Sequence, residues 1–238
     1  MYKYLIHHGI KGQNWGVKHG PPYPLDAEKH RTVIKKGNHL KRLTVNDESN
    51  RKGSAYVTIN KSDSNRYKGF FSANLRRLNR GKDVLQIDIT AKEDLISPSR
   101  KERVDTFIEL YKNDKNIGKE LGEYYKENWH YFSPGTKKHY EKKFSNLSDE
   151  ELTTTGYKVF ASSLGTKDYT RSKYFESLKN KGFNMVIDDL DAGKYGKEPA
   201  ILFEREKSTK FNGNIVVDKK ESKEIWREEG TKLKKYNK

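Results

Sequence analysis

The sequence predicts an α+β fold, because segments typical of strands come first, helical segments fill the middle and strands return later. The early strands are expected at "HLKRLTV", "GSAYVTIN" and "DVLQIDIT", and the later ones at "FNMVIDDLD", "PAILFERE" and "GNIVVD". Between these groups, residues 99 to 180 carry apolar side chains at helical spacing. A doubly wound sheet would instead alternate strands and helices along the whole chain.

The first elements are separated by clear turn signals. "RTVIKK" and "HLKRLTV" flank Gly37-Asn38, which predicts a hairpin. "KSDSNRYKGFFSANLRRLNRG" predicts a helix that Ser62 or Asp63 caps and Gly81 ends.

The middle and the end of the chain also carry helix boundaries. "SRKE" from Ser99 to Glu102 and "SDEE" from Ser148 to Glu151 have the spacing of capping boxes. Gly182 is placed to end the last helix of the middle region. From Lys219 onward the pattern predicts a charged helix.

The composition limits the function classes. The 238 residues include 15 Tyr and 10 Phe, enough aromatic side chains for a folded core, and 34% charged residues. The absence of cysteine excludes disulfides, thiolate nucleophiles and cysteine-ligated zinc. No apolar run approaches the roughly 20 residues that span a bilayer, so no membrane association is expected. The net charge of +16 favours a polyanionic partner such as nucleic acid, or else serves solubility.

The usual short enzyme motifs are missing. The chain has no phosphate-loop pattern, no G-x-S-x-G and no H-E-x-x-H. His7, His8 and His19 lie in a Gly-rich stretch without an obvious fourth ligand, so no metal site is expected there.

Three stretches carry candidate site residues. In "HLKRLTV", Arg42 has the planar guanidinium that binds phosphate through two bonds, although it also suits an exposed strand edge. In "AYVTINKSDSNRYKG", Tyr56 and Thr58 share a strand face and Tyr67 follows on a helix. These hydroxyls and rings suit a ribose or a flat heterocycle, and they are also common strand residues.

The third stretch is "GFNMVIDDLDAGKYGKEPAILFERE". Its carboxylates at strand ends, Asp188, Asp189, Asp191 and Glu198, flank a Gly-containing loop. They suit polarisation of a sugar hydroxyl, or else form an ordinary acidic hairpin loop.

In this order the three stretches resemble the ADP-ribosyltransferase fold over roughly residues 33 to 205. The family has an Arg on its first strand, an aromatic-x-Ser/Thr strand next, and a late loop and strand with the catalytic Glu. The resemblance implies a split-sheet core with a helical middle insertion, and NAD as the ligand.

Carried over to this sequence, the resemblance gives each candidate a role. It implies that Arg42, Tyr56, Thr58 and Tyr67 bind NAD, and that Glu198 is the catalytic carboxylate with Asp189 as a second candidate. The chain departs from the family in two places. Val57-Thr58-Ile59 replaces a Ser-Thr-Ser run, and Glu198-Pro199-Ala200 has alanine at the second acid position.

The N-terminal stretch has a resemblance of its own. "HHGIKGQNWGVKHGPPYPL" is similar to an H-x-G-x-K-G-x-x-W-G peptide that recurs at the ends of tailed-phage and prophage proteins. A recurring peptide of this kind suggests a portable tag, with Trp15, Lys11 and Lys18 as the residues that bind a host or phage protein. The alternative is a strap that packs Trp15 on its own domain.

These observations lead to three readings of the function. The first is a phage or mobile-element effector with ADP-ribosyltransferase activity, acting in the host cytoplasm or carried with the virion. The second is a transferase fold without turnover that binds or inhibits a host factor. The third is a virion-associated protein that contacts nucleic acid. The expected organisation is a tag or strap over 1–30, a domain over 31–218 and a charged helix over 219–238.

Overall fold

A computed structural model describes residues 30–45, 52–128, 144, 146–189 and 199–236. Its strands are β1 (Thr32–Ile34), β2 (His39–Thr44), β3 (Ala55–Thr58), β4 (Leu85–Ala91), β5 (Leu95–Ser97), β6 (Met185–Ile187), β7 (Pro199–Leu202) and β8 (Thr209–Val216). Its helices are α1 (Lys61–Leu78), α2 (Arg100–Asn113), α3 (Lys115–Asn128), α5 (Asp149–Glu151), the π-helical turn η2 (Leu152–Gly156), α6 (Tyr157–Ser163), α7 (Asp168–Asn180), α8 (Arg205–Ser208) and α9 (Lys219–Tyr236).

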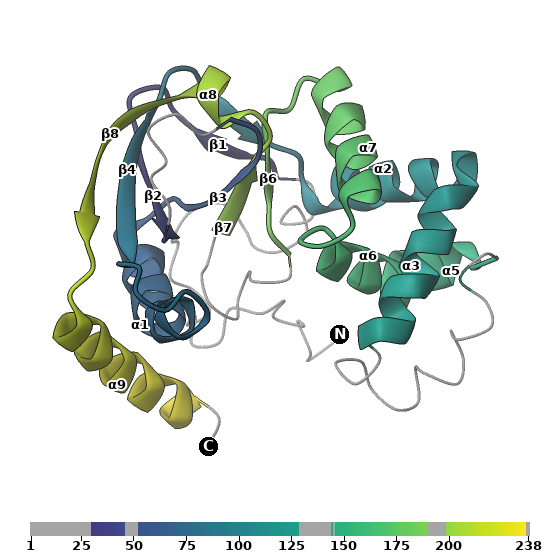
Figure 1. The fold of residues 1–238 in the computed structure, drawn as a ribbon. Helices are drawn as coiled ribbons and strands as arrows, with labels where there is room; N and C mark the ends of the chain where they lie inside the picture. Colours follow the sequence, from purple (N-terminus) through teal and green to yellow (C-terminus); the bar gives the residue numbers. More distant parts are fainter. Residues whose placement is uncertain (1–29, 46–51, 129–143, 145, 190–198, 237–238) are drawn as a thin grey trace, which may run out of the picture.

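The strands form a six-stranded antiparallel sheet in the order β6-β7-β3-β2-β4-β8, and β1 pairs separately with β5 (Figure 1). Together with the helices this is an α+β fold, as the sequence predicts.

The six-stranded sheet is joined weakly at its centre. Strands β2 and β4 are paired along six positions, whereas β2 and β3 are in register only where Lys41 faces Thr58. The strands on either side, β6-β7-β3 and β2-β4-β8, are thus joined through this short pairing, beyond which no further described residues of β2 and β3 are in register.

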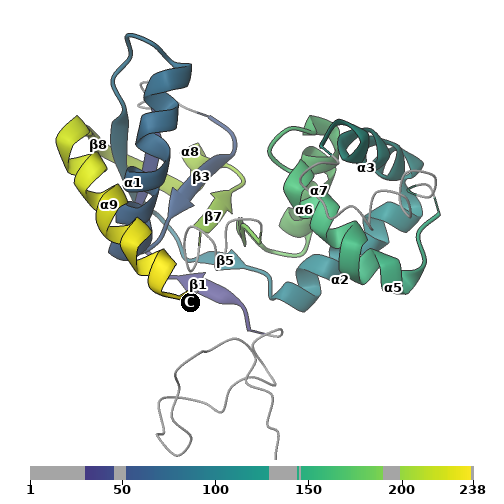
Figure 2. The same cartoon turned by 90° about the horizontal axis from the view of Figure 1, so that it is seen from below.

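The helices of the middle region form a lobe of their own. Helices α2, α3, α5, α6 and α7 pack together beside the β6–β7 end of the sheet (Figure 2). We call this the helical lobe, and the six-stranded sheet with α1 and α9 the sheet lobe. The core of the helical lobe is aromatic and reaches the sheet through three side chains of the β6–β7 region, namely Val186, Ile201 and Phe203.

The core of the sheet lobe is mainly aliphatic. Alternate residues of its strands point to one face, as the period of a strand requires. The fully buried members include Leu40, Ile87, Ile89, Met185 and Leu202. Ile34 and Leu95 from the β1–β5 pair complete this core.

Most helix boundaries confirm the sequence patterns. Both capping boxes form, at Ser99 and at Ser148, and Gly182 follows α7 with a φ of 86°. The cap of α1 differs from the prediction. Neither Ser62 nor Asp63 is the N-cap, because the side chain of Asn60 accepts a hydrogen bond from the Asp63 backbone N–H at 2.8 Å.

The predicted hairpin at Gly37-Asn38 is wrong in its pairing. The turn is present, with Gly37 at a φ of 87°, but β1 pairs with β5 and not with β2. Turn residues determine where the chain reverses. The partner of a strand of only three residues depends instead on which other strand the fold brings beside it, and here that strand is β5.

The C-terminal helix α9 begins at Lys219, as predicted, and packs against α1. Lys68 of α1 is buried and forms a 2.7 Å ion pair with Glu221. Gly69 allows the close approach, because a Cβ there would lie 3.0 Å from the Ile225 side chain and 3.1 Å from the Trp226 backbone nitrogen. In the part of the chain that the structure describes, no helix is long and apolar enough to span a membrane.

Candidate functional site

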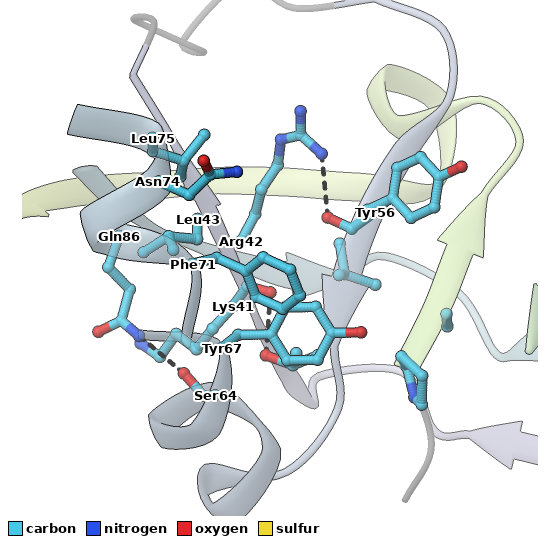
Figure 3. Close-up of a pocket in the computed structure, with 14 residues that line it drawn as sticks. Lys41, Arg42, Leu43, Tyr56, Ser64, Tyr67, Phe71, Asn74, Leu75 and Gln86 are labelled. Atoms are coloured by element: carbon cyan, nitrogen blue, oxygen red, sulfur yellow. Dashed lines mark hydrogen bonds between the residues drawn. The ribbon is translucent and has the colours of Figure 1, made fainter. Parts of the chain in front are cut away.

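A pocket of about 240 Å³ lies where β2 and β3 separate, with α1 as its wall (Figure 3). Its lining comes from β2, β3, β4, α1 and β7 and consists of Lys41, Arg42, Leu43, Tyr56, Val57, Thr58, Ser64, Tyr67, Phe71, Asn74, Leu75, Gln86, Pro199 and Ala200. All four residues predicted to bind a ligand, Arg42, Tyr56, Thr58 and Tyr67, are among them. The wall comes from α1, and none of these lining residues belongs to the helices of residues 99 to 180.

Two hydrogen bonds connect the separating strands. Thr58 donates its hydroxyl to the Lys41 carbonyl at 3.2 Å, between the same two residues that are in register. Arg42 donates from Nη1 to the Tyr56 carbonyl at 3.1 Å, beyond that position (Figure 3). The bond holds the Arg42 side chain between β2 and β3, and Arg42 and Tyr56 both line the pocket.

The aromatic side of the pocket is formed by Tyr67 and Phe71. They are four residues apart on α1, so both rings lie on one face of the helix. Their centroids are 5.0 Å apart with an angle of 36° between the ring planes. The motifs in the sequence did not single out Phe71, although its spacing of four residues from Tyr67 indicates that the two rings share a face of the helix.

Tyr56 is oriented differently from Tyr67. In Figure 3 its ring points away from Tyr67 and Phe71. Its hydroxyl reaches the helical lobe, where a Cβ on Gly165 would lie 3.5 Å from it. The rings of Tyr56 and Tyr67 therefore do not face each other as two sides of a sandwich, and Phe71 is the ring beside Tyr67.

Ser64 and Gln86 link α1 to the sheet under the pocket. Gln86 on β4 donates from Nε2 to the Ser64 hydroxyl at 2.7 Å. Sequence reasoning missed these residues and Asn74, because a polar side chain in an amphipathic pattern is also expected on any solvated surface.

A polar cluster on the sheet is connected to the pocket through Lys41. Its ammonium lies 2.8 Å from Asp88, which also contacts His39 Nδ1 at 3.1 Å and accepts a bond from Asn212 at 3.1 Å. Burial opposes ionisation of Asp88, but the bonds from Lys41, His39 and Asn212 outweigh it and lower the Asp88 pKa. Asp88 is therefore a carboxylate that balances the charge of Lys41 near neutral pH.

Glu198 lies outside the described residues, whereas the next residue, Pro199, is described. Pro199 is in register with Thr58 and lines the pocket, and its carbonyl accepts a 2.8 Å bond from the Asp188 backbone. Ala200 is fully buried between Val57 and Ile187, in register with both. Ala200, which stands at the second acid position of the family pattern, thus belongs to the apolar core of the sheet lobe.

Asp189, the other predicted carboxylate, does not line the pocket. It lies after β6 at the junction of the two lobes, where it accepts bonds from Arg103 Nε at 2.9 Å and Nη2 at 2.6 Å. The Tyr157 hydroxyl donates a third bond to it at 2.6 Å. Burial raises the pKa of Tyr157 well above the usual value, which keeps this hydroxyl protonated as a donor.

The other residues predicted to belong to a site lie outside the part of the chain that the structure describes. Lys11, Trp15 and Lys18 lie outside the described ranges, as do His7, His8, His19 and Asp191. Among the described residues, no three His, Asp or Glu side chains are grouped to hold a metal ion. Comparison of the chain with protein-family models, with curated proteins and with solved structures finds no match.

Proposed function

We propose that the pocket between β2 and β3 binds NAD and that the protein transfers ADP-ribose from it to a macromolecule. The observation that supports this most is that Arg42, Tyr56, Thr58 and Tyr67 line one pocket. These residues come from three separate elements, β2, β3 and α1, and the order of their motifs in the sequence is what the resemblance rests on. The central opening of the sheet fits the split-sheet core that the same resemblance implies.

The size of the pocket limits how much of NAD it holds. At about 240 Å³ it is smaller than the roughly 300 to 1,000 Å³ of pockets that enclose whole drug-sized ligands. It suits one flat ring and the adjoining sugar. Tyr67 and Phe71 offer aromatic faces to the ring, and Arg42 offers a fork of N–H donors to phosphate oxygens.

The proposed reaction breaks the bond between nicotinamide and the ribose. The electron pair leaves with nicotinamide, and positive charge develops on the ribose carbon and its ring oxygen. A carboxylate stabilises this charge by polarising a ribose hydroxyl. Glu198 is the proposed carboxylate, because it directly precedes Pro199 at the pocket. The acceptor then forms the new bond to the ribose carbon and releases its proton to a base or to water.

A second candidate function is binding of a host factor without turnover. The specific observation in its favour is Ala200, which is fully buried where many transferases have a second acid. A carboxylate at this fully buried position would lose its hydration, at a cost in stability. The site therefore retains the residues proposed for ligand binding but lacks a second group for activating an acceptor.

Incubation with labelled NAD and a bacterial lysate separates the two functions. We expect transfer of the label by the wild type, and a decrease of about 10²-fold or more in Glu198→Gln with NAD binding retained. Glu123→Gln, an exposed change on α3, is the control. Binding of NAD without transfer would favour the second function, and no binding of NAD would reject both uses of the pocket for this ligand.

A further inference from the structure

The end of the sheet lobe at the C-terminus of α1 carries a cluster of basic side chains. We define it by the exposed residues Arg77, Arg80, Lys82, Lys219 and Lys220 and call it the basic tip. Two segments that are far apart in the sequence form it, the turn from α1 to β4 and the start of α9.

Hydrogen bonds hold the two segments of the basic tip side by side. Arg76 donates to the Val217 carbonyl at 2.6 Å and to the Ser222 hydroxyl at 3.0 Å. The Val217 backbone N–H donates to the Val84 carbonyl at 2.7 Å, and Lys82 N–H closes the turn on Asn79 at 3.1 Å. α1 and α9 lie next to each other in both views (Figures 1 and 2).

The basic tip carries little compensating negative charge. Within residues 76–83 and 217–220 there are two acidic side chains, Asp83 and Asp218. Asp218 is engaged at the start of α9, where it accepts a 2.7 Å bond from the Glu221 backbone. Arg80, Lys82, Lys219 and Lys220 make no ion pair with any residue that the structure describes.

Helix stability does not explain this placement. Positive side chains stabilise the C-terminal end of a helix, which accounts for Arg77 in the last turn of α1. Lys219 and Lys220 lie in the first turn of α9, where the helix dipole disfavours positive charge. A bound polyanion would compensate for both this dipole and the mutual repulsion of the five cations.

We infer that the basic tip binds the phosphate backbone of duplex nucleic acid. Arg77 and Arg80 supply planar donors for phosphate oxygens, and the lysines supply further charge. The apolar side chains exposed near them, Leu78 and Val216, are 67% and 58% accessible and are aliphatic. They offer no ring on which unpaired bases stack, and the exposed ring of Trp226 lies about two turns further along α9, which favours a duplex over a single strand at the basic tip itself.

The basic tip borders the pocket but is a separate site. Arg77 donates to Asn74 at 2.9 Å, and Asn74 lines the pocket. Binding of a duplex at the basic tip needs no NAD, so this inference and the proposed transferase activity can fail independently.

The test measures fluorescence anisotropy of a labelled duplex of about 20 base pairs, two turns of B-form DNA, with the full chain and without NAD. Salt is varied between about 50 and 200 mM, where backbone binding is steeply salt-dependent. The variants are Arg80→Gln/Lys82→Gln and Lys219→Gln/Lys220→Gln. The control, Lys119→Gln/Lys126→Gln on α3, removes the same charge from exposed residues of the helical lobe.

We expect each double variant of the basic tip to bind roughly ten- to a hundredfold more weakly at 0.1 M salt, with the salt slope reduced by about 2. The control should stay within about twofold of the wild type. Equal losses in all three variants would overturn the inference, because net charge alone would then explain binding. Tighter binding of the matching single strand, or binding to phosphatidylserine vesicles but not to the duplex, would also overturn it.

Discussion

Arg42 in the sheet lobe and Arg103 in the helical lobe show two different uses of the same side chain. Arg103 is 8% exposed and is bonded through Nε and Nη2 to Asp189 and through Nη1 to the Pro98 carbonyl. Arg42 lines an open pocket and bonds to the Tyr56 carbonyl across two separating strands. A buried guanidinium with a matched carboxylate holds the fold together, whereas one at a pocket is placed to meet a ligand.

The surroundings of the two arginines differ in the same way. Burial opposes the charge on Arg103, but Asp189 overcomes this and raises the Arg103 pKa. The ion pair joins α2 to the end of β6 and thus the helical lobe to the sheet. It also fixes Asp189, the last described residue before the segment that contains Glu198. One arginine is therefore expected to affect stability and the other ligand binding.

The largest expected effect is on stability, from Arg103→Ala. This change leaves the carboxylate of Asp189, which is 19% exposed, without its cation; loss of one partner costs about 3–5 kcal/mol in fully buried pairs, so a loss at the lower end of this range is expected. Urea unfolding of the variant and the wild type measures it. Asp189→Asn keeps the shape of the side chain but removes the charge, so it should also destabilise the protein. A loss below about 1 kcal/mol for Arg103→Ala would mean that this junction does not hold the lobes together.

The corresponding change at the pocket, Arg42→Ala, should weaken NAD binding by about 10- to 100-fold. This is the loss expected when a hydrogen bond to a charged group, which contributes about 1.5–3 kcal/mol, is removed. Its free energy of unfolding should change by less than about 1 kcal/mol, since the bond to Tyr56 is a partly exposed one. Calorimetric titration and urea unfolding of the same protein provide both values. If Arg42→Ala lost as much free energy of unfolding as free energy of NAD binding, Arg42 would have a structural role like that of Arg103.

A smaller effect is expected from the aromatic wall. Tyr67→Ala removes one of the two aromatic faces proposed to contact the flat ring of the ligand, and it should weaken NAD binding by about two- to tenfold, the range of an aromatic contact. Tyr67→Phe keeps the ring and should bind as the wild type does. If Tyr67→Phe is as weak as Tyr67→Ala, the hydroxyl and not the ring makes the contact.

The smallest effect concerns acid stability at the start of α2, next to Arg103. A side-chain bond from Arg31 and the backbone N–H of Ser99 lower the Glu102 pKa to about 2 from an ordinary value of 4.5. This stabilisation is present above pH 4.5 and is lost as the pH falls toward 2, because the folded state must then protonate the carboxylate.

Glu102 and Arg31 are partly exposed, so the contribution is screened and should be below about 1 kcal/mol. Urea midpoints of Glu102→Gln and of the wild type should differ at pH 5 and converge toward pH 2. If the urea midpoints of Glu102→Gln and the wild type differed equally at all pH values, the stabilisation would come from the capping geometry and not from the charge of Glu102.

Local sequence patterns were enough to predict most of the helix boundaries. The capping boxes at Ser99 and Ser148, the end of α7 at Gly182 and the start of α9 at Lys219 all follow from residues within one helical turn. The α+β class follows from the order of these elements. Arg42, Thr58 and Tyr67 were identified as site residues from their motifs, and they line one pocket.

Which distant segments contact one another could not be predicted from such local patterns. The pairing of β1 with β5, the bond from Gln86 to Ser64 and the ion pair of Arg103 with Asp189 join positions between 22 and 86 residues apart. No local pattern specifies such a partner, since a strand edge or a charged side chain can pair with many others. The choice depends on packing of the whole chain, and for that reason the sequence offered Asp189 as a second candidate carboxylate without indicating its bonds to Arg103 at the junction of the lobes.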